Sequence, residues 1–290
     1  MSPRDLILAL FVVTVWGVNF IAIRWGVDEV APLLMTALRY LLAAIPAVFF
    51  IRRPAVSLPI LVGYGLAIGV AQFGLLFMAI HLGMPAGLSS LVMQLQAFFT
   101  IALAVIFLGE RPSPLQWAGA AIAFLGIGLI GLERLEGAAF LPLLLTIAAA
   151  FFWGVGNIVT KKAGKVDMLS FVVWSSLVPP IPMLALSLIF EPGAIPAAAE
   201  NLTWQGGGSL LFIAYASTLF GYGVWSMLLS RYPAGLVAPF SLLVPIAGMG
   251  SAALLLHETI SGIEIAGSLL VFVGLLINVF GPRLLKRAPA

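Results

Sequence analysis

Long runs of apolar residues, separated by short polar segments, fill almost the whole chain. We expect ten helices, each with about the 20 residues that a helix needs to cross the core of a lipid bilayer. No Asp, Glu, Lys or Arg occurs between Arg53 and Glu110, so this stretch holds two of the helices with a turn near 81–85. The expected spans are 6–26, 33–51, 58–80, 86–108, 114–132, 141–160, 168–190, 207–230, 235–256 and 262–281. The pattern predicts an all-α integral membrane protein.

The second half of the chain repeats short motifs of the first half. The sequence Pro-Ala-Gly-Leu at 85–88 returns at 233–236, and Glu110 corresponds to Glu258 at the same offset of 148 residues. Near the start of each half, Trp-Gly at 16–17 returns at 153–154, with an offset of 137. We therefore expect two copies of one five-helix unit, at 1–137 and 138–290. Because five is an odd number, the second copy is inverted in the membrane, as in transporters built from inverted repeats.

The composition fits a lipid environment. Of the 290 residues 62% are hydrophobic and 9% are charged, whereas a soluble domain carries about 25% charged residues. The lipid bilayer is therefore the expected partner of most of the surface. The net charge of +3 is scattered over short loops and forms no basic stripe, which argues against nucleic-acid binding.

Several kinds of chemistry lack the residues that they need. The chain has no Cys and two His residues far apart, so no metal site is expected. It has no phosphate-binding P-loop motif, so ATP hydrolysis is not expected. All 11 Asp and Glu residues lie at span ends or in loops, which argues against a carboxylate proton relay inside the membrane. We expect no catalytic residue, no cofactor and no enzyme activity.

The basic residues predict which side of the membrane each loop faces, because cytoplasmic loops carry an excess of Lys and Arg. The richer set of span ends holds Arg4, Arg52, Arg53, Arg111, Lys161, Lys162, Lys165, Arg231, Arg283, Lys286 and Arg287. The poorer set holds Arg24 and Arg134. We expect the richer set and both termini in the cytoplasm, in a multi-pass protein of a bacterial-type inner membrane.

Arg39 is the one basic residue in the interior of a predicted span, about two turns into the second. It either binds a substrate carboxylate or locks an outer gate, or else its side chain reaches the headgroups or bonds backbone carbonyls. His81 lies at the outer end of the third span, where it is placed to respond to protons. Arg39 and His81 are the candidate gating residues.

Polar and aromatic side chains inside the spans are the candidates for a substrate cavity. Amides donate and accept hydrogen bonds, as a zwitterion requires, but they also join helices to one another. Trp16 and Trp153 occupy equivalent places in the two halves and are expected to wall a central cavity. Asn157 comes one residue later in its motif than Asn19, which turns it by about 100° on a helix. The other candidates are Asn19, Gln72, Phe77, Ser90, Gln94, Asn157, Tyr215 and Tyr222.

These motifs together resemble the EamA family of the drug/metabolite transporter superfamily. The resemblance rests on Trp-Gly-x-Asn at 16–19 with its variant at 153–157, on the two Pro-Ala-Gly-Leu segments, and on Gly-Glu at 109–110 and His-Glu at 257–258. It covers nearly the whole chain. It implies a central cavity formed chiefly by spans one to four and six to nine. It also implies export of amino acids and similar metabolites, and the layout is similar to that of bacterial exporters of aromatic amino acids.

The sequence thus predicts a secondary transporter that exports neutral or aromatic amino acids, or similar small metabolites, by alternating access. An alternative is an efflux carrier for cationic or other drugs, in which aromatic rings would bind the cation. An intramembrane enzyme or a passive pore is less favoured, because paired catalytic groups and a ring of charge are both missing from the spans.

Overall fold

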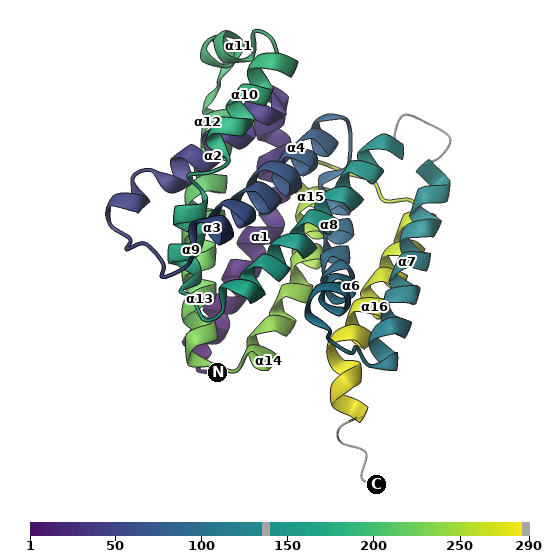
Figure 1. Ribbon diagram of the computed structural model, residues 1–290. Helices are drawn as coiled ribbons and strands as arrows, with labels where there is room; N and C mark the ends of the chain where they lie inside the picture. Colours follow the sequence, from purple (N-terminus) through teal and green to yellow (C-terminus); the bar gives the residue numbers. More distant parts are fainter. Residues whose placement is uncertain (135–139, 286–290) are drawn as a thin grey trace.

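The structure is a computed structural model that describes residues 1–134 and 140–285, and this part of the chain is a bundle of helices without strands (Figure 1). The boundary predicted between 137 and 138 lies outside the described residues, as do Lys286 and Arg287. Ten helical spans in the described part are long and apolar enough to cross a membrane. The prediction of ten transmembrane helices is confirmed.

The ten spans consist of α-helices, some of them interrupted by short 3₁₀ or π segments, labelled η. The first five spans are α1 (Pro3–Glu29); α2 (Pro32–Ala44) with η1 (Ala47–Phe49); α3 (Leu58–Tyr64), η2 (Gly65–Gln72) and α4 (Phe73–His81); α5 (Ala86–Val92), η3 (Met93–Leu95) and α6 (Gln96–Leu108); and α7 (Pro114–Arg134). The last five are α8 (Phe140–Ala163); α9 (Met168–Ser175) with α10 (Pro180–Phe190); α12 (Trp204–Leu211), η4 (Phe212–Phe220) and α13 (Gly221–Arg231); α14 (Ala234–Val237), η5 (Ala238–Leu243) and α15 (Val244–Leu255); and α16 (Gly262–Leu285).

The start of span eight differs from the sequence prediction. The connection between spans seven and eight contains the short helix α11 (Ala194–Asn201). Span eight begins at Trp204 rather than at 207, with Thr203 as its N-cap: the Thr203 side chain accepts a hydrogen bond from the backbone N–H of Gln205. A side-chain oxygen at this position satisfies a first-turn N–H that has no partner within the helix, which explains the earlier start.

Proline marks a break in span seven. The α-helix stops at Ser175 and resumes at Pro180, and Pro179 immediately precedes the second segment. Proline lacks a backbone N–H and its ring clashes with the preceding turn, so a break at these prolines follows from their chemistry.

Spans three and eight each contain a π-helix, η2 and η4. A π-helix has a wider turn than an α-helix, bonds from residue i to i+5, and often occurs at functional sites. Neither segment was predicted, since apolar residues with small ones among them fit an α-helix equally well. Their occurrence in the third span of each half supports the idea that the halves are copies of one unit.

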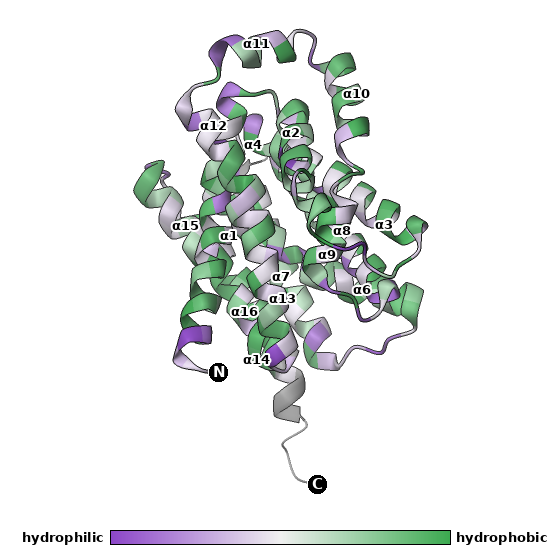
Figure 2. Ribbon diagram, turned by 90° about the vertical axis from the view of Figure 1, so that its left-hand side faces the viewer, coloured by the Kyte–Doolittle hydropathy of each residue, from purple (hydrophilic) through white to green (hydrophobic). Residues whose placement is uncertain are grey.

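Small residues bring helices together inside the bundle, while large apolar side chains face outward. A Cβ atom on Gly119 of α7 would lie 2.6 Å from the carbonyl oxygen of Gly274 in α16, so this pair of helices is in direct backbone contact. Ile106, Leu188 and Leu254 are each more than 60% exposed. Figure 2 shows apolar residues along the spans, with polar ones concentrated near their ends. Such a surface suits the hydrocarbon of a bilayer.

The start of α1 and the end of α16 lie at the same end of the bundle, here called the termini end (Figure 1). The turns at 82–85 and 256–261 lie at the opposite end, here called the far end. α15 packs on both α1 and α5, so span nine contacts spans one and four of the other half.

Candidate functional site

A pocket surrounds Arg39 at the place where spans two and three of the first half meet spans seven and eight of the second. The first half contributes Arg39, Tyr40, Tyr64, Gly65, Ile68, Gly69 and Phe73. The second half contributes Val172, Ser175, Ser176, Thr218 and Tyr222. None of these residues is Asp or Glu. The pocket therefore combines one cation with hydroxyl groups and aromatic rings, at an interface between the two halves.

Arg39 is buried, with 2% of its surface exposed, and most of its hydrogen-bonding capacity is unused. Its Nη2 donates a 2.9 Å hydrogen bond to Oγ1 of Thr218. Its Nε and Nη1 have no hydrogen-bond partner in the part of the chain that the structure describes. A buried guanidinium costs free energy unless it is paired, and in a membrane span such a residue commonly marks a substrate or ion path. Arg39 thus offers two free donors to an anion.

Aromatic rings surround the charge of Arg39. The Cζ atom of its guanidinium lies 3.9 Å from the ring centroid of Phe73, 4.8 Å from that of Tyr40 and 5.6 Å from that of Phe77. Cations within about 6 Å of an aromatic ring face are attracted by its quadrupole, and the attraction is stronger where water is excluded. These rings offset part of the cost of burying the charge without using its hydrogen-bond donors.

The π-helix of span eight places Thr218 against Arg39. The Thr218 hydroxyl donates a 2.9 Å hydrogen bond to the carbonyl oxygen of Ile213, five residues earlier. Because its proton is directed to Ile213, the oxygen of Thr218 is left as an acceptor for Arg39. The backbone of η4 therefore determines that Thr218 binds Nη2 of the guanidinium, while Nε and Nη1 are left without a partner among the described residues.

Glycines on the π-helix of span three allow the broken region of span seven to come close. A Cβ atom on Gly65 would lie 2.6 Å from Cβ of Val178 and 2.8 Å from the carbonyl oxygen of Ser175. Gly69 faces Pro179 with no room for a side chain. The Gly65-x-x-x-Gly69 spacing thus brings the end of α9 to the pocket, where Ser175 and Ser176 form part of the wall.

Several candidates from the sequence lie in or beside this pocket. Tyr222 lines it, and Phe77 is fully buried next to Arg39. Trp16 lies behind Tyr222, with ring centroids 5.5 Å apart, and its indole N–H donates to the carbonyl oxygen of Ser217 at 3.0 Å. Trp153 packs against the apolar cluster that contains Tyr64 and Ile68. The two tryptophans therefore lie behind the pocket rather than in its lining.

Other candidates have partners away from the pocket. Asn157 donates to Oε1 of Gln96 at 2.7 Å and to Oγ1 of Thr100 at 2.9 Å, which joins span six to span four. The Ser90 hydroxyl donates to the carbonyl oxygen of Gly87 at 2.6 Å. Nδ1 of His81 lies 3.1 Å from the carbonyl oxygen of Val27. Tyr215, at 36% exposed, is on the surface.

Three amides in the first half are buried. Oδ1 of Asn19 and Oε1 of Gln72 have no hydrogen-bond partner among the described residues. Gln72 ends η2 and precedes Phe73, so it adjoins the pocket along the chain. Gln94 lies within η3, in the middle of span four. A role for Asn19, Gln72 or Gln94 in binding stays a prediction.

Sequence reasoning missed three residues that contact or surround Arg39: Tyr40, Tyr64 and Thr218. A buried arginine predicts that partners exist, but the sequence does not say where they lie, because Thr218 is 179 residues away. Tyr40 follows Arg39 directly, and the sequence offered no reason to choose it over other aromatics.

A second, more open pocket lies at the termini end. It is lined by Ile51, Arg52, Arg53, Pro54, Ala55, Lys165, Val166, Asp167 and Ser170. The helix α9 runs from this pocket to the first, since Ser170 lines one while Val172 and Ser175 line the other. Three basic side chains thus surround the pocket at the end of α9 remote from Arg39.

Comparison with known proteins agrees with this architecture. A sequence profile described as the EamA-like transporter family matches residues 4–132 and again 140–280. A probable amino-acid metabolite efflux pump of Salmonella typhimurium is 47% identical, covering 99% of this chain and 99% of its own. A protein of the same name from Escherichia coli is 47% identical over 98% and 97%. A crystal structure that is 18% identical covers all of both chains with a TM-score of 0.63, which shows the shared fold. The chain therefore belongs to the EamA-like transporter family, whose members are membrane transporters and not enzymes.

Proposed function

We propose that this protein exports small amino-acid metabolites that carry a carboxylate, and that Arg39 binds the carboxylate. The observation that carries the proposal is the buried guanidinium, whose Nε and Nη1 have no partner in the described chain. A guanidinium binds a carboxylate through Nη1 with one N–H of Nη2, or through Nε with the other, and charge-assisted bonds of this kind are the stronger ones. The two relatives at 47% identity are named as amino-acid metabolite efflux pumps, which supports the same substrate class.

The walls of the pocket suit the rest of such a substrate. Tyr64, Phe73 and Tyr222 offer aromatic surface, which binds an apolar side chain by excluding water, at about 25 cal/mol per Å² buried. The hydroxyl protons of Ser175 and Ser176 go to the carbonyl oxygen of Val172, so the oxygens of these two side chains are available to accept a hydrogen bond from an amino group. Aromatic faces also attract an ammonium group. A neutral amino acid fits this combination better than a dicarboxylate, because the pocket lining holds one cation.

The position of the pocket suits alternating access. It lies where spans two and three meet spans seven and eight, and transporters with inverted repeats bind substrate at the interface of their repeats. In the proposal the two copies, 1–137 and 138–290, rock against one another about this pocket. Arg39 is closed in at 2% exposed, so a substrate reaches it after the halves move.

The basic residues support one orientation of the transporter in the membrane. We place the termini end in the cytoplasm of a bacterial inner membrane, because Lys and Arg collect there. The pocket with Arg52, Arg53 and Lys165 would then face the cytoplasm and attract an anionic group before it reaches Arg39 along α9.

A carrier for cationic drugs is disfavoured by the same observation. A second positive charge would have to bind beside a buried guanidinium in a pocket whose lining contains no Asp or Glu. Like charges at such a distance repel strongly where water is excluded. The two functions therefore predict opposite results in a competition experiment: a carrier for cationic drugs would bind an amine without a carboxylate, whereas the proposed exporter would not.

The test is counterflow in liposomes that contain the purified protein. Liposomes are loaded with unlabelled phenylalanine, threonine or methionine and diluted into the labelled compound. Phenylalaninamide and phenethylamine, which lack the carboxylate, serve as matched competitors. We expect saturable exchange of at least one of these amino acids, with competition by carboxylates and none by the amide or the amine. Correctly folded protein that exchanges none of these compounds, or that exchanges the amine better, would contradict the proposal.

A further inference from the structure

Glu258 is one of several carboxylates that link the two halves at the far end, where Glu191 also accepts from the backbone N–H groups of Leu33 and Leu34. Oε1 of Glu258 accepts a 2.8 Å hydrogen bond from the backbone N–H of Ala86, and Oε2 accepts one of 3.0 Å from Gly87. Glu258 follows span nine, whereas Ala86 and Gly87 begin the 23-residue span four. The first N–H groups of a helix have no partner inside it and carry the positive end of its dipole, so a carboxylate is well matched to them.

The packing around this contact is tight. A Cβ atom on Gly87 would lie 3.1 Å from Cα of Met249 and 3.2 Å from Oε2 of Glu258. A Cβ atom on Gly17 would lie 2.6 Å from Cβ of Ala247, so span one also contacts span nine. Span nine is therefore in close contact with span four at the far end and with span one near the middle of both helices, and Glu258 adds two hydrogen bonds to the contact with span four.

The equivalent glutamate of the first half is placed differently. Glu110 lies 148 residues before Glu258, and the same offset relates Ala86 and Gly87 to Ala234 and Gly235. In the structure Glu110 forms a 2.9 Å ion pair with Lys161 instead, and the two side chains are 51% and 44% exposed. Exposed ion pairs of this kind contribute little to stability. Both glutamates therefore contact the other half, but Glu258 accepts from the start of span four, whereas the described partner of Glu110 is the exposed Lys161 at the end of span six.

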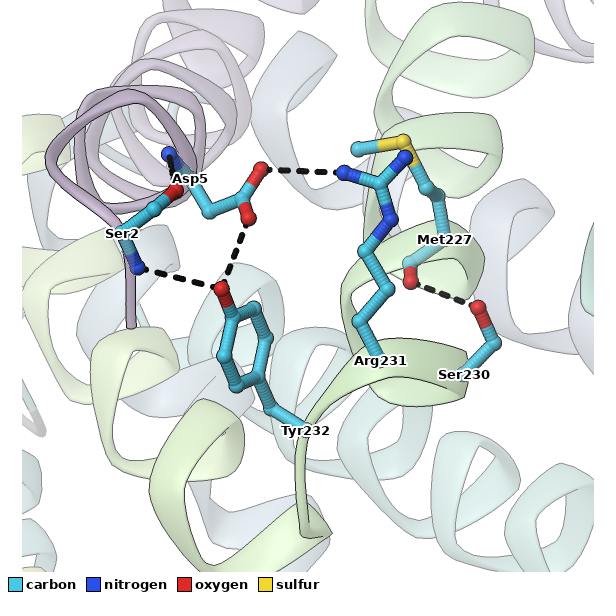
Figure 3. Close-up of polar contacts among 6 residues, drawn as sticks. All are labelled: Ser2, Asp5, Met227, Ser230, Arg231 and Tyr232. Atoms are coloured by element: carbon cyan, nitrogen blue, oxygen red, sulfur yellow. Dashed lines mark hydrogen bonds and ion pairs between the residues drawn. The ribbon is translucent and has the colours of Figure 1, made fainter.

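The segments that carry these N–H groups are held to α1 at both ends. At the termini end, Asp5 accepts from the Tyr232 hydroxyl at 2.8 Å and pairs with Arg231 at 3.3 Å, as Figure 3 shows. At the far end, Nη1 of Arg24 donates to the carbonyl oxygen of Ile80 at 3.0 Å. Both turns are thus fixed to the same helix.

We propose that Glu258 and Glu110 are alternating latches of the transport cycle. In the conformation described here Glu258 holds span four and closes the far end. In the opposite conformation Glu258 releases Ala86 and Gly87, while Glu110 leaves Lys161 and accepts from the backbone N–H groups of Ala234 and Gly235. Because each inverted copy takes the conformation of the other, one latch forms as its counterpart opens, and the free energies of the two states stay close.

The experiment measures the two conformations directly and needs no substrate. The chain has no Cys, so pairs of introduced cysteines can carry spin labels without background. Leu82→Cys with Thr259→Cys reports on the far end, and Leu108→Cys with Leu236→Cys reports on the termini end; all four positions are exposed. Distance distributions are recorded in liposomes for the otherwise unchanged chain, for Glu258→Gln, for Glu110→Gln and for the double variant.

We expect opposite shifts from the two single variants. Glu258→Gln loses the charge of one latch and should raise the population open at the far end by about tenfold. Glu110→Gln should lower that population, and the double variant should lie between the two. Glu133→Gln is the matched control, since its carboxylate also lies near the far end and accepts from the Ser261 hydroxyl at 2.7 Å; it should change neither distribution.

If Glu258→Gln and Glu110→Gln shift the distance distributions in the same direction, or if folded protein shows no shift, the proposal of alternating latches is wrong. If Glu258→Gln disturbs folding, Gly87→Ala is the second variant, because its methyl group lies against Met249 and Glu258 and should open the same contact. Loss of thermal stability without a change in either distance distribution would show a merely structural role and would also overturn the proposal. The result is independent of the substrate, so a failure of the carboxylate assay leaves this test intact.

Discussion

Arg39 in the first half and Ser176 in the second half occupy corresponding positions, 137 residues apart, at the offset that relates Trp16 to Trp153. Both line the central pocket, one from span two and the other from span seven. The Ser176 hydroxyl donates to the carbonyl oxygen of its own turn, at Val172, whereas Arg39 donates across the pocket to Thr218. The backbone framework is repeated here, but the charge occurs once.

The difference separates two requirements of a carrier. Similar halves, with π-helices in spans three and eight, allow the two conformations to have similar free energies. Substrate recognition instead needs one defined chemical group, since two buried arginines in one pocket would repel each other. Substitutions at residues where the halves differ should therefore change transport, with the largest effect expected at Arg39 and the smallest at Asn157.

Arg39→Gln should have the largest effect. We expect the counterflow rate of a carboxylate substrate to fall by about 100-fold or more, because the loss of a buried charge partner leaves the carboxylate unpaired. Arg39→Lys should recover little of it, since an ammonium lacks the planar pair of donors. The matched control is Arg4→Gln, whose native side chain is exposed at the start of α1. Variants of Arg39 that transport as well as the native protein would contradict its role.

Thr218→Val should raise the KM of the same substrate by about tenfold and leave the fold intact. It removes the oxygen that holds Nη2 of Arg39, so the guanidinium becomes less well oriented and its burial less well compensated. Thr218→Ser retains the oxygen and should remain close to the native protein. Equal losses in the Val and Ser variants would point to packing by the Thr218 methyl group instead.

Phe73→Leu should have a smaller effect on binding. The ring centroid lies 3.9 Å from the guanidinium of Arg39, and a cation–π contact contributes about 0.5–2 kcal/mol. We expect KM to rise by about three- to tenfold, measured by counterflow at several substrate concentrations. Phe151→Leu is the control, because that ring packs on Phe99 and Phe152, away from Arg39. An unchanged KM would show that Arg39 does not depend on the ring.

Asn157→Leu compares the two motif asparagines and should have the smallest effect on transport. Asn157 joins span six to Gln96 and Thr100, and such a contact inside a membrane is worth about 0.6–2 kcal/mol. We expect a lower unfolding temperature in detergent with an unchanged KM. Asn19→Leu should cost less stability, since Oδ1 of Asn19 has no partner among the described residues. The reverse order of stability would contradict this assignment.

The amino-acid sequence was sufficient to predict the ten spans. About 20 apolar residues per span follow from bilayer thickness alone, and Lys or Arg at the ends adds a local signal. The repeat was also readable, because Pro-Ala-Gly-Leu and the glutamates recur at a constant offset. Arg39 could also be singled out from the sequence. A charged side chain inside an apolar span costs free energy whatever its neighbours are, so it marks a residue with a function.

The surroundings of Arg39 were decided only by the tertiary structure. The Thr218 oxygen can accept from Arg39 because, in the π-helix η4, the Thr218 hydroxyl proton is donated to the carbonyl oxygen of Ile213. Ser176 lines the pocket because Gly65 and Gly69 leave room for span seven to pack closely against span three. The same holds for Glu258, which the sequence showed only as the repeat of Glu110 and which the fold brings to the start of span four. Local periodicity determines which residues enter a span, whereas contacts between residues more than 100 positions apart depend on how the spans pack.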